Sequence, residues 1–260
     1  MFDLLKRQLL DAEERLTRSS NPASERIAVF DLDGTLLIGD IGDAVFALLT
    51  SEHHTRNLSW REYQKLLRTH RSKAYRAVVE AMAGQDVATV VQATSAVMNL
   101  KKEHLLLHSD LVRTPRPRPL LSQFVSFLQE LRYQVFVISA SNHISVRHVA
   151  QQWFNIPPSH AFGIQARIRE GQISPELIEP VPIGAGKAEV FRHAAGAAVP
   201  LVTGTDSRLD LPLLQLTHPQ GLSLWIGDDH IDFDVVREHT PAGQRFFFVD
   251  SGEKTLSNGF

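Results

Sequence analysis

The sequence predicts an α/β fold, a doubly wound and mostly parallel sheet into which an all-helical domain is inserted. Beyond residue 119, segments typical of strands alternate with segments typical of helices. The apolar run 27–30 ends in acidic residues and a Gly-Thr turn, as a buried strand does at a ligand-binding sheet edge. Residues 38–118 show helical periodicity almost throughout. We therefore expect a core domain of residues 1–37 and 119–260 and a helical cap domain of residues 38–118.

Composition sets the broad class of the protein. With 260 residues, 43% hydrophobic and 22% charged, the chain is long enough for one large or two modest globular domains. A formal net charge of −2 and the lack of a long basic block argue against nucleic-acid and membrane partners. The absence of cysteine excludes disulfides and thiolate metal sites, and with no visible signal peptide we expect a cytoplasmic protein. The oligomeric state is not indicated.

The first half of the chain is expected to be a helix, a strand and the helical insertion. Residues 1–18 form an amphipathic helix that packs on the core through Phe2, Leu5, Leu9, Ala12 and Leu16. The insertion has plausible breaks at Gly84 and at 100–101. Its aromatic residues Trp60 and Tyr63 are expected in the core, and Arg61, Arg68 and Arg71 in solvent.

A proline-rich segment marks the return from the insertion to the core. Prolines at 115, 117 and 119 cannot continue a helix and favour an extended, stiff segment. The elements that follow are a helix at 120–131, a strand at 134–138, a helix at 144–154, a β-hairpin at 162–174, a helix from about 187, and strands at 199–202, 222–226 and 245–249. This alternation predicts the parallel sheet.

Two aspartates follow the first strand directly. Asp31 and Asp33 stand one residue apart and are followed by Gly34 and Thr35. Two carboxylates beside a backbone that a ligand can approach closely suit a hard cation and a phosphate group. One aspartate can attack phosphorus while a metal ion neutralises the phosphate oxygens.

This Asp-x-Asp-Gly-Thr string after an apolar strand resembles the first signature of the haloacid-dehalogenase-like (HAD) hydrolases. The resemblance implies the Rossmann-like HAD fold and a Mg²⁺-dependent phosphatase that hydrolyses a small phosphomonoester. It further implies that Asp31 attacks phosphorus to form an aspartyl-phosphate. Asp33 would protonate the leaving oxygen and then activate the hydrolytic water.

The resemblance implies further phosphate-binding groups. Ser139, at the end of the strand 134–138, matches the second signature, and Ser141 could also bind phosphate or could cap the next helix. Lys187 matches the third signature because it follows a small-residue loop at a helix start. Gly34 and Thr35 would contribute to the same phosphate site.

Two pairs of acids match the fourth, metal-binding signature. Asp206 and Asp210 form one pair, and Asp228 and Asp232 form the other. The family's usual spacing favours the first pair, because Asp206 lies 19 residues after Lys187 whereas Asp228 lies 41 after it. The resemblance implies that this pair forms the Mg²⁺ site with Asp31 and Asp33: Asp31, the backbone carbonyl of Asp33 and Asp206 would hold the ion, and Asp210 would orient Lys187 or a water on the metal. Thr205 stands where the family usually has glycine.

The position of the insertion resembles the phosphoserine-phosphatase-like branch of the family. In that branch an acid seven residues after the second aspartate helps to bind the substrate's amino group, and here this residue is Asp40. With Asp43 it would favour amino- or choline-bearing substrates such as phosphoserine, phosphoethanolamine or phosphocholine. Both acids could equally cap the first helix of the insertion.

Three other functions remain open at this point. A phosphotransferase or mutase would use the same groups, and a catalytically silent phosphate-binding module would keep the pocket alone. A dehalogenase is disfavoured because it needs no second acid at Asp33. Mg²⁺-dependent release of p-nitrophenol from its phosphate ester would separate the phosphatase from the silent module.

Overall fold

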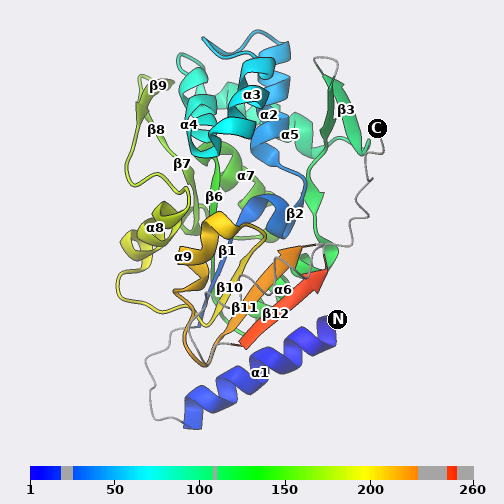
Figure 1. The fold of residues 1–260 in the computed structure, drawn as a ribbon, viewed down its shortest axis with the longest axis vertical. Coiled ribbons are helices and arrows are strands. Elements are labelled where there is room, and N and C mark those ends of the chain that lie inside the picture. The colour runs from blue at the N-terminus through cyan, green and yellow to red at the C-terminus, as the bar shows by residue number, and fades with distance from the viewer. Residues whose placement is uncertain (19–25, 108–109, 228–244, 251–260) are drawn as a thin grey trace.

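The computed structural model of the protein describes residues 1–18, 26–107, 110–227 and 245–250. Its centre is a six-stranded parallel sheet in the order β12-β11-β10-β1-β6-β7 (Figure 1). These strands are β12 Arg245–Asp250, β11 Leu222–Gly227, β10 Val202–Thr205, β1 Ile27–Phe30, β6 Gln134–Asn142 and β7 Ala161–Ile164. The predicted doubly wound α/β fold is confirmed.

Strand β1 lies at the point where the winding of the sheet reverses. All four of its residues are buried, as expected for a parallel strand that is covered on both faces. It pairs with β10 on one side and β6 on the other. The sheet is therefore extended from β1 toward one edge by β6 and β7, and toward the other edge by β10, β11 and β12. Such a switch point is where open α/β sheets bind ligands, at the carboxyl ends of the strands.

Helices cover both faces and one end of the sheet. They are α1 Phe2–Arg18, α6 Pro119–Glu130, α7 His143–Phe154, α8 Ala185–Ala195 and the short α9 Leu211–Leu214. Helix α1 packs on α6 and β11 below the sheet in Figure 1. Leu5 and Leu9 on its apolar stripe are fully buried, which confirms the predicted amphipathic helix.

The insertion, residues 38–118, lies above the carboxyl edge of the sheet in Figure 1. Its helices are α2 Ile41–Ser51, α3 Trp60–Thr69, α4 Arg71–Ala81 and α5 Val87–Met98. Helix α3 begins with a capping box in which Ser59 and Glu62 satisfy each other's backbone amides. Trp60 and Tyr63 are buried against the ring of Phe46, as the sequence predicted.

The insertion is not helical to its end. Strands β3 His104–Leu107 and β4 Asp110–Arg113 form an antiparallel hairpin where an almost entirely helical segment was expected. Each run is too short for a stable helix, and alternate side chains such as Leu105 and Val112 face inward as a cross-strand pair.

Two other element boundaries differ from expectation. The hairpin expected at 162–174 starts later, as β8 Ala166–Arg169 and β9 Gln172–Leu177, because residues 161–164 join the main sheet as β7. The strand expected at 199–202 is β10, which runs to Thr205. In both cases pairing with a neighbouring strand, rather than local hydrophobicity, sets the boundary.

The two crossings between core and insertion are paired with each other. Strand β2, Leu37–Ile38, leads out, and β5, Arg116–Pro117, leads back antiparallel to it. This confirms the extended segment predicted from the prolines, and Pro119 occupies the first turn of α6. Among the described residues no helix combines the length and the apolar character needed to cross a membrane.

Candidate active site

Four segments of the core bring polar side chains to the carboxyl edge of the sheet. Asp31 follows β1, Ser139 and Ser141 lie near the end of β6, Lys187 lies in the first turn of α8, and Asp206 follows β10. A cavity of about 780 Å³ opens beside them, between the sheet edge and the insertion. The structure therefore brings together residues from the first three signatures and from the pair Asp206 and Asp210, which the spacing from Lys187 favoured for the fourth.

Lys187 lies between two carboxylates. Its Nζ is 2.7 Å from Asp31 Oδ1 and 2.7 Å from Asp210 Oδ2, and the Thr205 hydroxyl also donates to Asp210 Oδ2. Burial alone would lower the pKa of Lys187, but the two carboxylates outweigh it and raise the pKa above its usual value. Lys187 is therefore a fixed positive charge beside Asp31. Thr205, which stands where the family usually has glycine, helps to hold Asp210 in place through this hydrogen bond.

Asp33 is held by three donors. Its Oδ2 accepts hydrogen bonds from the hydroxyls of Ser139 and Ser141, both at 2.7 Å, and its Oδ1 accepts one from the Ile41 amide at 2.7 Å. Burial raises the pKa of Asp33 above its ordinary value, although these hydrogen bonds oppose the rise. A raised pKa favours the protonated form that a general acid needs.

The two serines thus contact the acid Asp33 directly. Ser141 does not cap the helix that follows, because Asn142 is the N-cap of α7 and accepts from the Ser145 amide. The alternative of a capping role for Ser141 is therefore wrong. Both hydroxyls line the cavity and can rotate toward a phosphate oxygen.

The loop after Asp33 is packed against Asp206. Gly34 has φ +73°, and a Cβ atom there would lie 2.1 Å from Asp206 Oδ2. The Thr35 hydroxyl donates to Asp206 Oδ1 at 3.0 Å and is fully buried, so in this structure it orients Asp206 rather than facing the cavity. Only glycine permits both the backbone conformation and the close approach.

Asp31 and Asp206 are the carboxylates placed to hold a metal ion. Burial raises the pKa of each, and the negative charge of Asp206 adds to the rise at Asp31. Carboxylates crowded in a buried site are stabilised in their charged form by a cation, and an oxygen-only donor set suits Mg²⁺. The residues therefore fit the ion that the sequence suggested.

Not all four predicted metal-binding acids converge. Within the described ranges, no three His, Asp or Glu side chains are grouped as metal ligands. The carboxylate of Asp33 is turned to the serines, and that of Asp210 is turned to Lys187. A metal ion here would need backbone or water oxygens besides Asp31 and Asp206. The alternative pair, Asp228 and Asp232, lies outside the described residues.

Asp40 and Asp43 have different surroundings. Asp40 lines the cavity and also caps α2, accepting from the Asp43 amide at 2.8 Å. Asp43 accepts a hydrogen bond from the Tyr63 hydroxyl and does not line the main cavity. Burial raises the pKa of Asp40, and it raises that of Asp43 to about 6. Asp40 therefore caps the first helix of the insertion, as one alternative held, and the same side chain can still face a ligand in the cavity.

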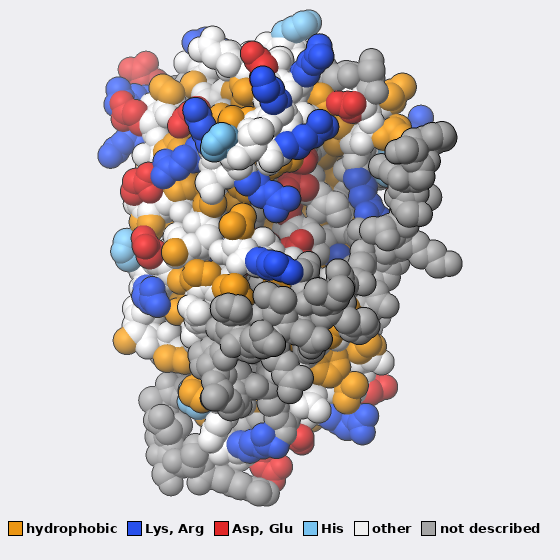
Figure 2. All heavy atoms as spheres, in the orientation of Figure 1, with side chains coloured by type: hydrophobic (Ala, Val, Ile, Leu, Met, Phe, Trp, Pro, Cys, Tyr) orange, Lys and Arg blue, Asp and Glu red, His pale blue; other side chains and the backbone are white. Residues whose placement is uncertain are grey.

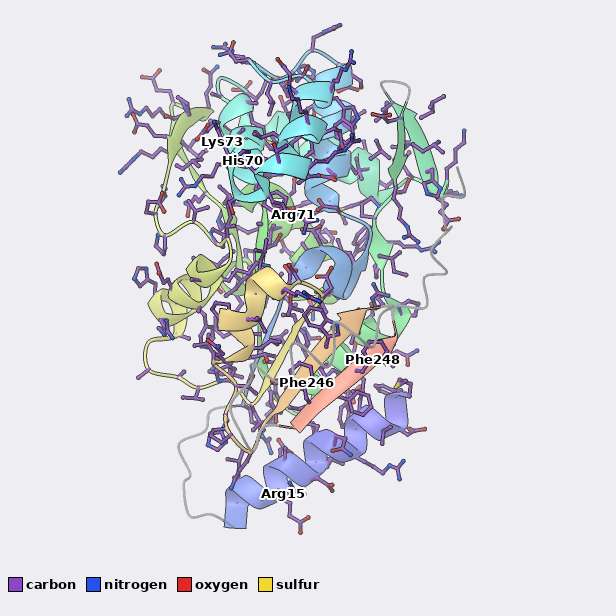
Figure 3. All side chains as sticks on the ribbon, viewed as in Figure 1. Arg15, His70, Arg71, Lys73, Phe246 and Phe248 are labelled. Carbon is purple, nitrogen blue, oxygen red and sulfur yellow. The ribbon has the colours of Figure 1, made fainter. Side chains whose placement is uncertain are left out.

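Several cavity residues were missed from the sequence. They are Arg71, Tyr75, Arg113, Arg118 and Arg208. Arg71 is exposed, as expected, and it also lines the cavity at the boundary between the insertion and the core (Figure 3). Arg113 precedes the proline-rich return segment and Arg118 lies within it, and this placement at a domain crossing was the one signal that could have identified them.

Arg118 has a defined structural contact. It is buried, and its guanidinium donates to the carbonyl oxygens of Thr35 and Gly34 at 3.0 and 2.9 Å. The cationic side chains also mean that the cavity is not lined by negative charge alone. Arg71 and Arg113 line the same space as Asp40.

Comparison with known proteins supports this arrangement. The profile of the family described as haloacid dehalogenase-like hydrolase matches residues 28–215. The comparison with curated proteins gave no match. Two similar solved structures are proteins of unknown function, one from Anaerococcus prevotii DSM 20548 and one from Bordetella pertussis Tohama I. Each has a TM-score of 0.65 and 15% identity, and they cover 87% and 86% of this chain and 86% and 98% of their own.

A third similar structure is a phosphoserine phosphatase solved as an analogue of its phospho-aspartyl intermediate. It has a TM-score of 0.55 and 14% identity, and it covers 86% of this chain and 93% of its own. At these identities the three structures establish the fold, and the chemistry must be argued from the residues.

Proposed function

Because the chain belongs to the haloacid dehalogenase-like hydrolase family, we propose that it is a Mg²⁺-dependent phosphatase acting on a small phosphomonoester. The observation that carries the proposal is the pairing of two aspartates at one strand end, Asp31 buried and Asp33 half-buried. Asp31 is placed beside the fixed cation Lys187, and Asp33 is placed beside hydroxyl and amide donors. Two carboxyl groups in different surroundings can take different roles.

The first half of the reaction is transfer of the phosphoryl group to Asp31. A carboxylate oxygen of Asp31 forms a bond to phosphorus as the bond from phosphorus to the leaving oxygen breaks. Asp33, in its protonated form, gives its proton to that oxygen, so the product leaves as a neutral alcohol. The raised pKa of Asp33 supports this role.

The second half is hydrolysis of the aspartyl-phosphate. Asp33, now ionised, takes a proton from a water molecule, and the water oxygen attacks phosphorus as the bond to Asp31 breaks. Inorganic phosphate leaves, and Asp33 has regained its proton. Lys187 and the hydroxyls of Ser139 and Ser141 would contact the transferring oxygens, where negative charge is greatest.

Asp31, Asp206 and the backbone oxygen of Asp33 would hold Mg²⁺, which would supply charge neutralisation at the phosphate oxygens. Asp210 acts through Lys187 by holding its Nζ toward Asp31. We propose the insertion, residues 38–118, as a cap domain that excludes water during phosphoryl transfer. Asp40 is proposed to bind an amino or quaternary ammonium group next to the phosphate, as in phosphoserine, phosphoethanolamine or phosphocholine.

The decisive experiment is phosphate release from p-nitrophenyl phosphate with and without Mg²⁺. The wild type should be active with Mg²⁺ and inactive with EDTA. Asp31→Asn should lose at least about a thousandfold in kcat because it removes the nucleophile. Asp86→Asn, the same change at an exposed helix N-cap outside the cavity, is the matched control and should keep full activity.

Other outcomes would contradict parts of the proposal. If verified Asp31→Asn keeps a tenth of the wild-type activity, Asp31 is not the nucleophile. Absence of turnover by the wild type, with phosphate still bound, would instead support the silent module. If phosphoethanolamine is hydrolysed no better than p-nitrophenyl phosphate, or if Asp40→Asn slows the hydrolysis of both equally, Asp40 does not bind the positively charged group of the substrate.

A further inference from the structure

A second cavity adjoins the active-site cavity inside the insertion. It measures about 340 Å³ and lies between helix α3 and the strand β4. Asp40 and Arg113 line both cavities, so these two side chains stand at the junction between them. The second cavity, here called the side cavity, is further lined by Gln64, Arg68 and Leu111, which do not line the first.

The acids of the side cavity already have donors. The Trp60 indole nitrogen donates to Asp110 Oδ2 at 2.8 Å, and the Tyr63 hydroxyl donates to Asp43. Both donors come from α3 and turn these carboxylates toward the buried aromatic side chains. The side cavity therefore presents fewer available acceptors to a ligand than its three aspartates suggest.

The cations of the side cavity are placed differently. Arg68 is exposed in the last turn of α3, and its side chain makes no hydrogen bond or ion pair among the described residues. Arg113 lies at the inner end, next to the active-site cavity. Figure 2 shows Lys and Arg side chains interspersed with Asp and Glu side chains over the upper half of the molecule. Arg68 and Arg113 are the cations that line the side cavity itself and can attract an anion there.

We propose that the side cavity binds the far end of an extended leaving group that carries a terminal anion, with Arg68 as its binding residue. The phosphate would sit at Asp31, the chain of the leaving group would pass Asp40 and Arg113, and its anionic end would reach Arg68. The inference rests on the proposed phosphatase function and specifies the class of its substrate.

The test compares three phosphate esters on the full-length enzyme with Mg²⁺. Carboxyheptyl phosphate carries the terminal anion, heptyl phosphate has the same length without it, and p-nitrophenyl phosphate is short. The wild type should show the highest kcat/KM for carboxyheptyl phosphate. Arg68→Glu should lower that value by about tenfold and leave p-nitrophenyl phosphate unchanged, because a charge reversal acts only on the ligand that reaches it.

Two further variants separate a local contact from general effects. Lys65→Glu makes the same charge change on the same exposed helix but outside the side cavity, and it should not alter the preference. Gln64→Trp fills the side cavity and should reduce kcat/KM for both heptyl esters while sparing the short one. Thermal unfolding of each variant checks that the insertion remains folded.

The outcomes are distinguishable. If p-nitrophenyl phosphate is hydrolysed but the wild type shows no preference for the carboxylate, the inference is wrong and the phosphatase function stands. If Lys65→Glu lowers the preference as much as Arg68→Glu, the effect is general attraction and the side cavity is not a binding site. If none of the three esters is hydrolysed, the proposed function fails and the inference with it.

Discussion

Replacing Gly34 with alanine tests the most closely packed contact of the site. Gly34 lies in the loop after the two aspartates with φ +73°, where a Cβ atom costs about 1–2 kcal/mol. That atom would also lie 2.1 Å from Oδ2 and 2.7 Å from Cγ of Asp206. Because real Cβ contacts below 3.0 Å are essentially never seen, the carboxylate of Asp206 must move. The shift required is about 1 Å.

The displacement should affect activity more than stability. A misplacement of about 1 Å in a catalytic group costs on the order of a hundredfold in rate. Asp206 would also lose its hydrogen bond from Thr35. We therefore expect Gly34→Ala to lower kcat/KM about a hundredfold and to raise the Mg²⁺ concentration needed for half-maximal rate. The melting temperature should fall by roughly 2–8 °C, since 1 kcal/mol corresponds to about 2–4 °C at this size.

Gly171→Ala is the matched control. Gly171 has φ +82° in the turn between β8 and β9, and a Cβ atom there would have no neighbour within 4 Å. This variant carries the backbone strain without the clash, so it should lose similar stability and keep full activity. Mg²⁺ titrations of p-nitrophenyl phosphate hydrolysis and thermal unfolding measure both quantities. A fully active Gly34→Ala enzyme with a normal Mg²⁺ requirement would refute the assigned position of Asp206.

Two other predictions concern single acids. Asp206→Asn should raise the Mg²⁺ requirement sharply and Asp228→Asn should change it little, and the reverse pattern would show that the metal pair was wrongly chosen. Burial raises the pKa of Asp43 from 3.8 to about 6, so the folded state binds its proton more tightly and loses stability as pH rises between these values. The asparagine of Asp43→Asn can still accept a hydrogen bond from Tyr63. Its free energy of unfolding should exceed that of the wild type by up to about 3 kcal/mol at pH 8, and the two should be equal at pH 4. Equal melting-temperature differences at both pH values would contradict this.

The site residues that sequence identified are those fixed by strand ends. Asp31 ends the first buried strand, and parallel neighbours must bring their own carboxyl ends to the same edge. Choosing Asp206 over Asp228 needed the spacing from Lys187 that is usual in the family which the sequence resembles, and β10 does pair directly with β1. Local pattern was sufficient for Asp31, which follows an apolar strand, whereas Lys187 and Asp206 were selected through the family resemblance.

The residues that sequence missed depend on contacts across the chain. The pairing of Arg118 with Gly34 and Thr35 joins residues more than eighty positions apart. Nothing in the local pattern distinguishes this arginine from Arg116, which lies on the surface and pairs with Glu103. The hairpin β8–β9 was placed only in part for the same reason, since its position depends on pairing with the insertion, where Ile173 bonds Gly84 and Gln85.

Arg118 also explains why the insertion and the catalytic loop are not independent of each other. It directly follows β5, the return crossing, and its backbone amide donates to Leu36 just before the outgoing strand β2. Its guanidinium holds the carbonyl groups of Gly34 and Thr35, and Thr35 in turn holds Asp206. The crossings and the loop that carries Asp33 therefore form one hydrogen-bonded unit. Any movement of the insertion about these crossings must either leave this unit intact or disturb the placement of Asp206.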